Sequence, residues 1–338
     1  MMKPSLVIAL LCCATAHAGV WDRALTSPED AAAKELYDAK LVEGDTATLT
    51  STIQSTSPSV VLQSLRRAEQ AYRAAAAARP REAEPYFRIG NLLYQMYFNC
   101  DGLPLAIRPV TCDPVYATSA RRDQTIEAWN QFERLAPLDP RIGEILGNRA
   151  ILHTKAVNGT RGDRAHLEAA ARDYQAAFDR SDGLTKARGD EEVLLGNLAE
   201  TYMMLDRLDD AIATYGRAVA GGSSVATTYG LAVALDRDGS GEQASRYILG
   251  QGKEGLETFT KEYLARNVFF VPEGEAYYYF ALAHEAFGHP GVALGFWLRY
   301  VASGAHPEFQ PRAKEHIEQL EKHHARVEAP PDPDEPRW

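Results

Sequence analysis

The sequence predicts an all-α fold, a right-handed α-solenoid of stacked helix pairs. Two recurring patterns in its 338 residues lead to this prediction. A triplet of Ile or Leu, Gly and Asn opens three apolar-periodic stretches, at 89–91, 146–148 and 195–197. A small residue lets two helices approach closely, and a ring four residues later fills the space beside it on the same face. Such alanine–ring pairs recur at Ala68/Tyr72, Ala128/Phe132, Ala170/Tyr174 and Ala211/Tyr215.

Residues 1–18 are expected to be an export signal that is removed. Lys3 supplies the positive start, LVIALLCC is a short apolar run, and an A-x-A cleavage site ends at Ala18. The run is too short to span a bilayer, for which about 20 apolar residues are needed. Lipid attachment at Cys12 or Cys13 is left open, although leucines stand just before this pair, where a small residue is expected. We therefore expect a periplasmic or secreted protein, cleaved near Ala18.

After a helical lead-in at 19–58, residues 59–307 resemble the tetratricopeptide repeat family. Its unit of about 34 residues pairs a first helix of the pattern W-x₂-L-G-x₂-Y with a second helix of the pattern A-x₃-F-x₂-A, followed by proline. The Gly-Asn triplets resemble the first pattern and the alanine–ring pairs the second, and Pro80 and Pro140 follow two of the second helices. The resemblance implies a concave face lined mostly by the first helix of each pair.

Two insertions depart from the family pattern, at 99–118 and 157–164, and the leucine register of the third unit is open. The first insertion holds Cys100 and Cys112, the two cysteines that remain after signal removal. In an oxidising compartment this pair is expected to form a structural disulfide. Metal binding would need further ligands at short spacing, and redox catalysis favours C-x-x-C, so neither alternative fits as well.

The stretch HEAFGH, His284–His289, is close to the zinc-protease motif H-E-x-x-H. Its histidines are five residues apart rather than four, so on one unbroken helix they would diverge by about 140°. Aligned with the repeat, Gly288 makes the turn between two helices, Ala293 is the small residue and Trp297 the ring. We interpret HEAFGH as the end of a repeat helix and its turn, which leaves a metal-dependent hydrolase as the weakest of three hypotheses.

Asp236–Gly241, DRDGSG, resembles the first half of a calcium loop. The twelfth position of such a loop should hold a bidentate glutamate, and here it is Tyr247. A plain polar turn is favoured, with weak calcium binding left open. No catalytic set, no metal site and no other cofactor is expected.

The family resemblance also implies a peptide-binding groove. Some members hydrogen-bond an extended peptide through the asparagine of the first helix, and members that clamp a terminal carboxylate carry a lysine four residues earlier. Here Phe87 and Glu144 occupy that earlier place, so the groove predicts a neutral or basic segment as ligand. The same aromatic side chains could instead only pack beneath the inserted loops. The expected groove residues are Phe87, Asn91, Tyr94, Glu144, Asn148, Tyr278 and Glu285.

Residues 308–327, which include His316, are expected to form a solvated capping helix, and 328–338 a flexible, acidic, proline-rich tail. The net charge is −10, or −11 without Lys3 of the signal, because no other charged residue lies in 1–18. An acidic surface argues against binding to a nucleic-acid backbone.

We therefore expect a non-enzymatic, exported scaffold that binds a protein or peptide partner of unknown identity in the bacterial envelope. The alternative is a solute-binding or transport-accessory protein that holds a small ligand in the solenoid cavity. Its basis is the density of rings at Tyr277, Tyr278, Tyr279, Phe280 and Trp297.

Overall fold

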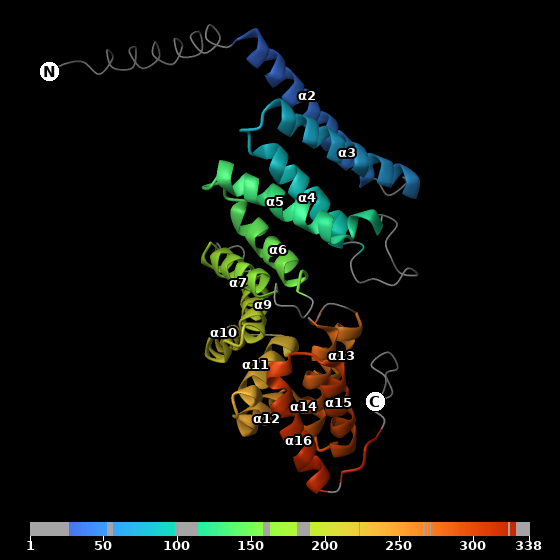
Figure 1. Cartoon of the computed structure of the whole chain (residues 1–338), viewed down its shortest axis with the longest axis vertical. Coiled ribbons are helices and arrows are strands. Elements are labelled where there is room, and N and C mark those ends of the chain that lie inside the picture. Colours follow the sequence, from blue (N-terminus) through green and yellow to red (C-terminus); the bar gives the residue numbers. More distant parts are fainter. Residues whose placement is uncertain are drawn as a thin grey trace, which may run out of the picture. The chain divides into compact units, whose positions relative to one another are not determined.

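The computed structural model describes residues 27–52, 57–98, 100, 114–157, 163–180, 190–222, 224–265, 268, 270, 272–323 and 325–328. Within these ranges every regular element is a helix and no strand occurs, which confirms the all-α prediction (Figure 1). No helix in the described ranges is long and apolar enough to cross a membrane. The chain divides into two compact units, Met1–Asp139 and Pro140–Trp338.

The first unit consists of helices that each pack against the next one along the chain. Two of them begin in the same way, because Ser27 and Ser57 have extended backbone and are each followed by a proline at the first helical position. The Ser27 hydroxyl accepts the Asp30 N–H at 3.1 Å and so satisfies one free donor of the first turn. The elements are α2 (Pro28–Ser51), α3 (Pro58–Ala78), α4 (Glu84–Phe98), the short 3₁₀ helix η2 (Pro114–Tyr116) and α5 (Ser119–Leu135).

Two glycines show how closely the helices of the first unit approach. A Cβ on Gly44 of α2 would overlap the ring of Tyr72 of α3. A Cβ on Gly90 of α4 would overlap the indole of Trp129 of α5, which is fully buried. The glycine of the first Ile-Gly-Asn triplet is therefore explained by packing, because any side chain there would force α4 and α5 apart.

The second unit also packs consecutive helices against each other, and α11 in addition contacts α13 and α14. Its elements in chain order are α6 (Ile142–Thr154), α7 (Asp163–Asp179), α9 (Asp190–Met204), α10 (Leu208–Ala220), α11 (Val225–Arg237), α12 (Gly241–Gly250), α13 (Gly252–Leu264), η3 (Glu273–Glu275), α14 (Ala276–Ala286), α15 (Pro290–Ser303), η4 (Pro307–Phe309) and α16 (Gln310–Lys322).

Three connections in the second unit have the same geometry. They join α9 to α10, α11 to α12 and α14 to α15, and each centres on one residue with positive φ: Asp206 at 58°, Gly239 at 88° and Gly288 at 75°. In each turn the N–H of the next residue returns to the carbonyl five residues earlier. These bonds are Arg207 to Tyr202 at 2.9 Å, Ser240 to Leu235 at 2.8 Å and His289 to His284 at 2.9 Å. One helix-ending geometry therefore recurs after α9, α11 and α14.

The alanine–ring pattern occupies the same environment wherever it occurs. Both members of each pair are buried, which agrees with the close helix approach that the pattern predicts. The pairs are Ala68/Tyr72 and Ala128/Phe132 in the first unit, and Ala170/Tyr174, Ala211/Tyr215 and Ala293/Trp297 in the second.

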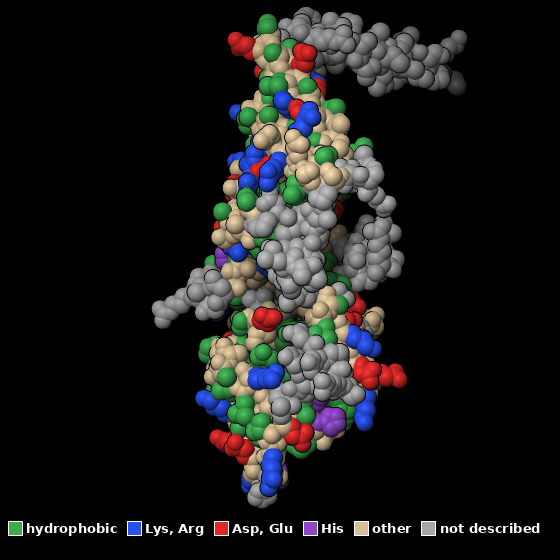
Figure 2. Space-filling model, turned by 90° about the vertical axis from the view of Figure 1, so that its right-hand side faces the viewer, with side chains coloured by type: hydrophobic (Ala, Val, Ile, Leu, Met, Phe, Trp, Pro, Cys, Tyr) green, Lys and Arg blue, Asp and Glu red, His purple; other side chains and the backbone are tan. Residues whose placement is uncertain are grey.

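Several expected segments lie partly or wholly outside the described residues. These are the signal at 1–18, residues 19–26 and 53–56 of the lead-in, residues 99, 101–113 and 158–162 of the two insertions, residue 324 of the capping segment, and all but residue 328 of the tail. The expected capping segment at 308–327 corresponds to α16, followed by residues that run back toward α15, where the N–H of Glu328 donates to the Gly291 carbonyl at 3.1 Å. On the face drawn in Figure 2, cationic and anionic side chains are interspersed.

Candidate functional site

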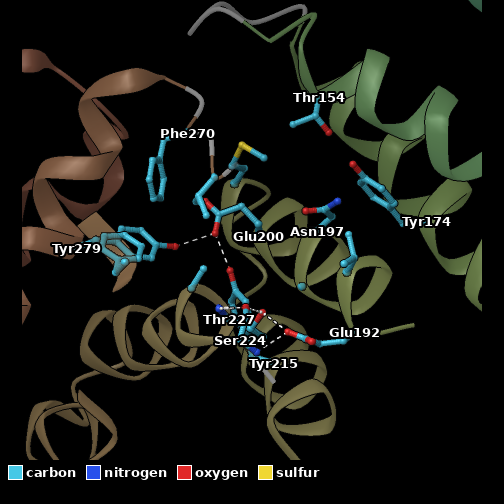
Figure 3. A pocket seen from close by; sticks show the side chains of 16 residues that line it. Thr154, Tyr174, Glu192, Asn197, Glu200, Tyr215, Ser224, Thr227, Phe270 and Tyr279 are labelled. Atoms are coloured by element: carbon cyan, nitrogen blue, oxygen red, sulfur yellow. Dashed lines mark hydrogen bonds between the residues drawn. The ribbon is translucent and has the colours of Figure 1, made fainter. Parts of the chain in front are cut away.

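A pocket of about 230 Å³ lies among the helices of the second unit (Figure 3). The helices α6, α9, α11 and α14 contribute Thr154, Asn197, Thr227 and Tyr279, respectively. Val193 also lines the pocket and is 59% exposed, so the pocket opens to solvent. The remaining lining residues are Tyr174, Glu192, Gly196, Glu200, Met204, Tyr215, Ser224, Ala226, Phe259, Val268 and Phe270.

One face of α9 forms the floor of this pocket. Val193, Gly196, Asn197, Glu200 and Met204 follow the spacing of three and four residues that places side chains on a single side of a helix. Figure 3 shows Asn197 and Glu200 projecting into the space between Thr154 and Tyr174 on one side and Phe270 and Tyr279 on the other. The side chains of Asn197 and Glu200 therefore enter the pocket from the same face of α9.

The carboxylate of Glu200 is held by two tyrosines through a single oxygen. Tyr215 Oη donates to Glu200 Oε2 at 2.6 Å, and Tyr279 Oη donates to the same oxygen at 2.8 Å. Burial and the nearby Glu200 carboxylate raise the pKa of both tyrosines well above the usual value, so both hydroxyls remain donors. Among the described residues, Glu200 Oε1 and the side-chain amide of Asn197 take part in no hydrogen bond.

The second carboxylate of the pocket has a structural task. Glu192 Oε1 accepts the backbone N–H of Ser224 at 2.6 Å and the hydroxyl of Thr227 at 3.1 Å. Ser224 is the N-cap of α11, so this carboxylate neutralises free donors and the positive end of the helix dipole. Glu192 therefore joins the start of α9 to the start of α11.

An aromatic wall closes the other side of the pocket. Phe259 of α13 stacks on Tyr279 with ring centroids 5.8 Å apart, and Phe270 lies 4.7 Å from Tyr279. Phe270 belongs to the apolar NVFFV stretch that the sequence suggests to be packed, and its ring also contacts Phe259 at 6.2 Å. The wall is therefore held on several sides and presents ring surface to the floor formed by α9.

The groove residues expected in the first unit face the neighbouring helix α5. Phe87 is 8% exposed and its ring lies 5.1 Å from that of Phe132. Trp129 Nε1 donates to Asn91 Oδ1 at 3.0 Å, and the Tyr94 ring lies 5.3 Å from Trp129. Burial raises the pKa of Tyr94 to about 12. The rings of Phe87 and Tyr94 thus pack against α5, whereas the alternative left open by the sequence was packing beneath the inserted loops.

Of the other expected groove residues, Glu144 is exposed and Asn148 half-buried on α6, whereas Tyr278 and Glu285 lie inside the second unit. Tyr278 is fully buried, so its side chain cannot reach a surface ligand, and the structure corrects that assignment. Glu285 accepts Trp297 Nε1 at 2.9 Å and also contacts His316 Nδ1 at 3.0 Å. Glu285, which the family resemblance places in the groove, therefore holds α16 through His316.

Asp236, the first residue of the DRDGSG stretch for which weak calcium binding was left open, belongs to the same buried cluster. The Tyr278 hydroxyl donates to Asp236 Oδ2 at 2.7 Å, Arg312 Nη2 donates to Oδ1 at 2.7 Å, and His316 Nε2 lies 3.0 Å from Oδ2. Both carboxylate oxygens are thus occupied and the side chain is fully buried, so Asp236 is not free to bind calcium at a surface turn. We call Asp236, Glu285, Arg312 and His316 the α16 latch.

His316 was expected on a solvated face and is instead 6% exposed between two carboxylates. Burial alone would lower its pKa, but the hydrogen bonds and charges of Asp236 and Glu285 raise that pKa to about 9. The expectation was wrong because the terminal segment is predominantly polar. Charge pairing, rather than apolar burial, draws its imidazole inside.

The histidines of HEAFGH do approach each other, with His284 Nδ1 and His289 Nδ1 3.2 Å apart. The two histidines do not lie on one continuous helix, in agreement with the interpretation of HEAFGH as the end of a helix and its turn. The helix ends at Ala286, and the turn centred on Gly288 brings residues five apart together, as it does for Tyr202 and Arg207. Burial, with a smaller effect of His289, lowers the pKa of His284 to about 4. No group of three or more His, Cys, Asp or Glu side chains that could hold a metal ion occurs in the described residues.

The rings that suggested a solute cavity mostly fill each other's space. Tyr278 packs edge-on against Trp297 at 4.6 Å, and Phe280 stacks on Phe296 at 5.3 Å. Of the five rings, only Tyr279 lines the pocket. Cys100 is buried, whereas Cys112 lies outside the described residues, so their disulfide stays a prediction.

Asn197 and Glu200 are the site residues that the sequence-based assignment missed. Asn197 belongs to the third Gly-Asn triplet, where it holds the place of Asn91 and Asn148. The triplet could have found it, had the leucine register of that unit not been left open. Glu200 carries no motif, because its role depends on tyrosines contributed by α10 and α14.

Comparison with known proteins identifies no relative of this chain: no protein-family model matches it, and no curated protein does so at a significant level.

Proposed function

We propose that the chain is a non-enzymatic scaffold of tetratricopeptide-like helix pairs, arranged as a right-handed solenoid, that binds an extended segment of a partner protein. The repeated turn after α9, α11 and α14 supports the repeat, because one helix-ending geometry recurs in three pairs. We place the binding site in the α9 pocket and not in the first unit. There, Phe87 and Asn91 are already engaged by α5.

One observation carries this assignment: hydrogen-bonding groups that have no partner among the described residues face an aromatic wall in a solvent-open pocket. Ligand sites typically combine apolar walls with a few convergent polar groups. Asn197 supplies an amide that can both donate and accept, as pairing with a peptide backbone requires. In the family it resembles, the same position hydrogen-bonds extended peptides in some members.

The pocket volume favours a segment of chain over an enclosed solute. Pockets for drug-sized ligands commonly measure about 300–1,000 Å³. At about 230 Å³, this pocket suits a single side chain whose backbone lies across the opening. The solute-binding alternative loses its main support, because Tyr278 and Trp297 pack against each other rather than around a cavity.

Site-specific photocrosslinking tests the proposal. A benzoylphenylalanine at Val193, which is exposed and lines the pocket, should crosslink to a defined segment of a partner protein in cells that make this chain. The same group at Leu249, which is 49% exposed on α12 outside the pocket, is the matched control. A synthetic peptide of the crosslinked segment should then bind the purified protein and lose affinity with Asn197→Ala. Equal crosslinking from the two sites would contradict the proposal.

Export and the disulfide are part of the same proposal and have their own tests. We expect the purified protein to begin at Gly19 by N-terminal sequencing and to fractionate outside the cytoplasm. Thiol alkylation should leave Cys100 and Cys112 unmodified until a reductant is added. A protein that retains residues 1–18, or that has two freely alkylated thiols, would contradict this part.

A further inference from the structure

We propose that the α9 pocket takes a primary ammonium group on an unbranched alkyl chain, as in the side chain of a lysine of the bound segment. This inference rests on the proposed function and names the chemistry of its ligand. Its first support is charge. The pocket is lined by the carboxylates of Glu192 and Glu200, and no Lys, Arg or His occurs among its described lining residues.

The neighbouring cation in the protein is already paired. Arg237 lies over the rings of Tyr278 and Phe309, and its Nη2 donates to Glu275 Oε1 at 2.6 Å. Both side chains of this ion pair are almost completely buried. Glu192 is used by the start of α11. Glu200 is thus the carboxylate of the pocket that lacks a compensating positive charge among the described residues.

The distribution of acceptors favours an ammonium over a guanidinium. Each carboxylate oxygen offers about two acceptor positions, and the two tyrosine hydroxyls fill both on Glu200 Oε2. A guanidinium prefers to bind both oxygens of one carboxylate in parallel, which that arrangement prevents. An ammonium is a compact charge with three rotatable donors, and it can use Glu200 Oε1 together with Asn197 Oδ1.

The walls suit the rest of such a side chain. Val193 and Met204 offer apolar surface on α9 for a methylene chain. Phe270 and Tyr279 present rings near Glu200, and aromatic faces attract cations. Asn197 and Glu200 lie three residues apart, so one face of α9 fixes both acceptors relative to each other.

The test uses small probes and a local signal. Labelled methyl groups of methionine report the site, because Met204 lines the pocket whereas Met96 lies in the first unit. Nα-acetyl-lysine-N-methylamide, whose side-chain ammonium is free, should shift the methyl signal of Met204 saturably and leave that of Met96 unchanged. The norleucine analogue, which lacks the ammonium, should bind at least 10-fold more weakly, and so should the arginine analogue. Equal binding of either analogue, or no shift of Met204 with the lysine probe, would overturn the inference.

Butylamine separates a lysine side chain from a free amine as the ligand. It carries the same ammonium without a backbone, so we expect it to bind more weakly than the lysine probe. Binding as tight as that of the lysine probe would overturn the assignment to a lysine of a bound chain.

Matched variants locate the effect. Glu200→Gln keeps an oxygen for the two tyrosines and removes the charge, so it should weaken the lysine probe at least 10-fold. Asn197→Ala should weaken it less. Glu257→Gln, which removes an exposed carboxylate of α13 outside the pocket, should leave binding unchanged. Equal losses in Glu200→Gln and Glu257→Gln would show general charge attraction and overturn the inference.

The two proposals fail separately. If Val193 crosslinks a defined segment but the lysine probe has no effect on Met204, the peptide site stands and the ammonium inference falls. If the probe binds but no segment crosslinks, the site is one for a small cation and the scaffold proposal falls.

Discussion

Tyr278 and Tyr279 are neighbours on α14, yet their hydroxyls donate to two carboxylates with opposite surroundings. Tyr278 donates to Asp236, which also contacts Arg312 and His316. Tyr279 donates to Glu200, whose other partner within the described part of the chain is a second tyrosine. One carboxylate is fully compensated inside the protein, and the other faces a pocket open to solvent.

Because of this difference, we expect Asp236 to contribute to the stability of the fold and Glu200 to the binding of a ligand. Buried charges are costly unless they are paired and hydrogen-bonded, so removing one partner from the α16 latch leaves others uncompensated. A carboxylate without a cation partner is available to a ligand, and its removal should strand no charge within the protein. We therefore expect substitutions at Asp236 and Glu200 to affect different measurements.

The largest expected effect is that of Asp236→Ala. The substitution leaves Arg312 and His316 without their shared carboxylate, and breaking a buried pair typically costs about 3–5 kcal/mol. Chemical denaturation followed by circular dichroism would measure the loss in unfolding free energy. Asp238→Ala, an exposed position at the end of the same helix, is the control and should change it by less than about 0.5 kcal/mol. Similar losses in the two variants would contradict the latch.

The next largest expected effect is a fall in the free energy of unfolding as the pH is raised into the alkaline range. Because Asp236 and Glu285 raise the pKa of His316 to about 9, the folded protein holds a proton that the unfolded chain releases near pH 6.5. The stabilisation is therefore complete below about pH 6.5 and is lost as the pH rises through 9, up to about 3 kcal/mol. Denaturation between pH 6 and 10 should show this slope in the wild type and lose most of it in His316→Gln. The same slope in both proteins would argue against the assigned proton.

A smaller effect concerns the tyrosines that hold Glu200. A Cβ on Gly230 of α11 would lie 2.5 Å from the Tyr215 ring, so Gly230→Ala should cost about 1–3 kcal/mol through overpacking. Gly216→Ala on α10 meets no atom within 4 Å and should instead stabilise the helix by about 0.5–1 kcal/mol. Opposite signs of the two changes in denaturation midpoint are the expected result. A stabilising Gly230→Ala would show that Tyr215 is not held against α11.

The smallest expected effect on stability is that of Glu200→Gln. The amide oxygen can accept both tyrosine hydroxyls and no cation loses its partner, so the unfolding free energy should change by less than about 1 kcal/mol. Denaturation under the conditions used for Asp236→Ala checks this value. A loss as large as that of Asp236→Ala would mean that Glu200 is a structural residue.

The helical fold could be predicted from the sequence because it follows from short-range patterns. An alanine followed by a ring four residues later, as in Ala211 and Tyr215, predicts close helix packing. A glycine between two apolar-periodic stretches, such as Gly239 or Gly288, predicts a helix end. Long-range pairing could not be predicted in the same way. Asp236 and His316 are 80 residues apart, so the DRDGSG stretch, interpreted as a polar turn with weak calcium binding left open, gives no sign of its actual partners. The turn between His284 and His289 could be predicted from Gly288, but the close approach of the two rings could not.

The pocket was missed for the same reason. Asn197 repeats the position of Asn91, yet α5 uses Asn91 while Asn197 remains open, and the sequence of either triplet does not show which outcome applies. What distinguishes them is Trp129, which fills the space beside Asn91. The corresponding space beside Asn197 is bounded by Tyr279 and Phe270.

The most direct measurement is the photocrosslinking yield from Val193, compared between the wild type and Glu200→Gln. We expect a defined partner segment to crosslink in the wild type, at a yield well above that of Leu249, and this yield to fall to the control level in the variant. Equal yields from Val193 in both proteins, or no excess over Leu249, would contradict a binding pocket built around the uncompensated carboxylate.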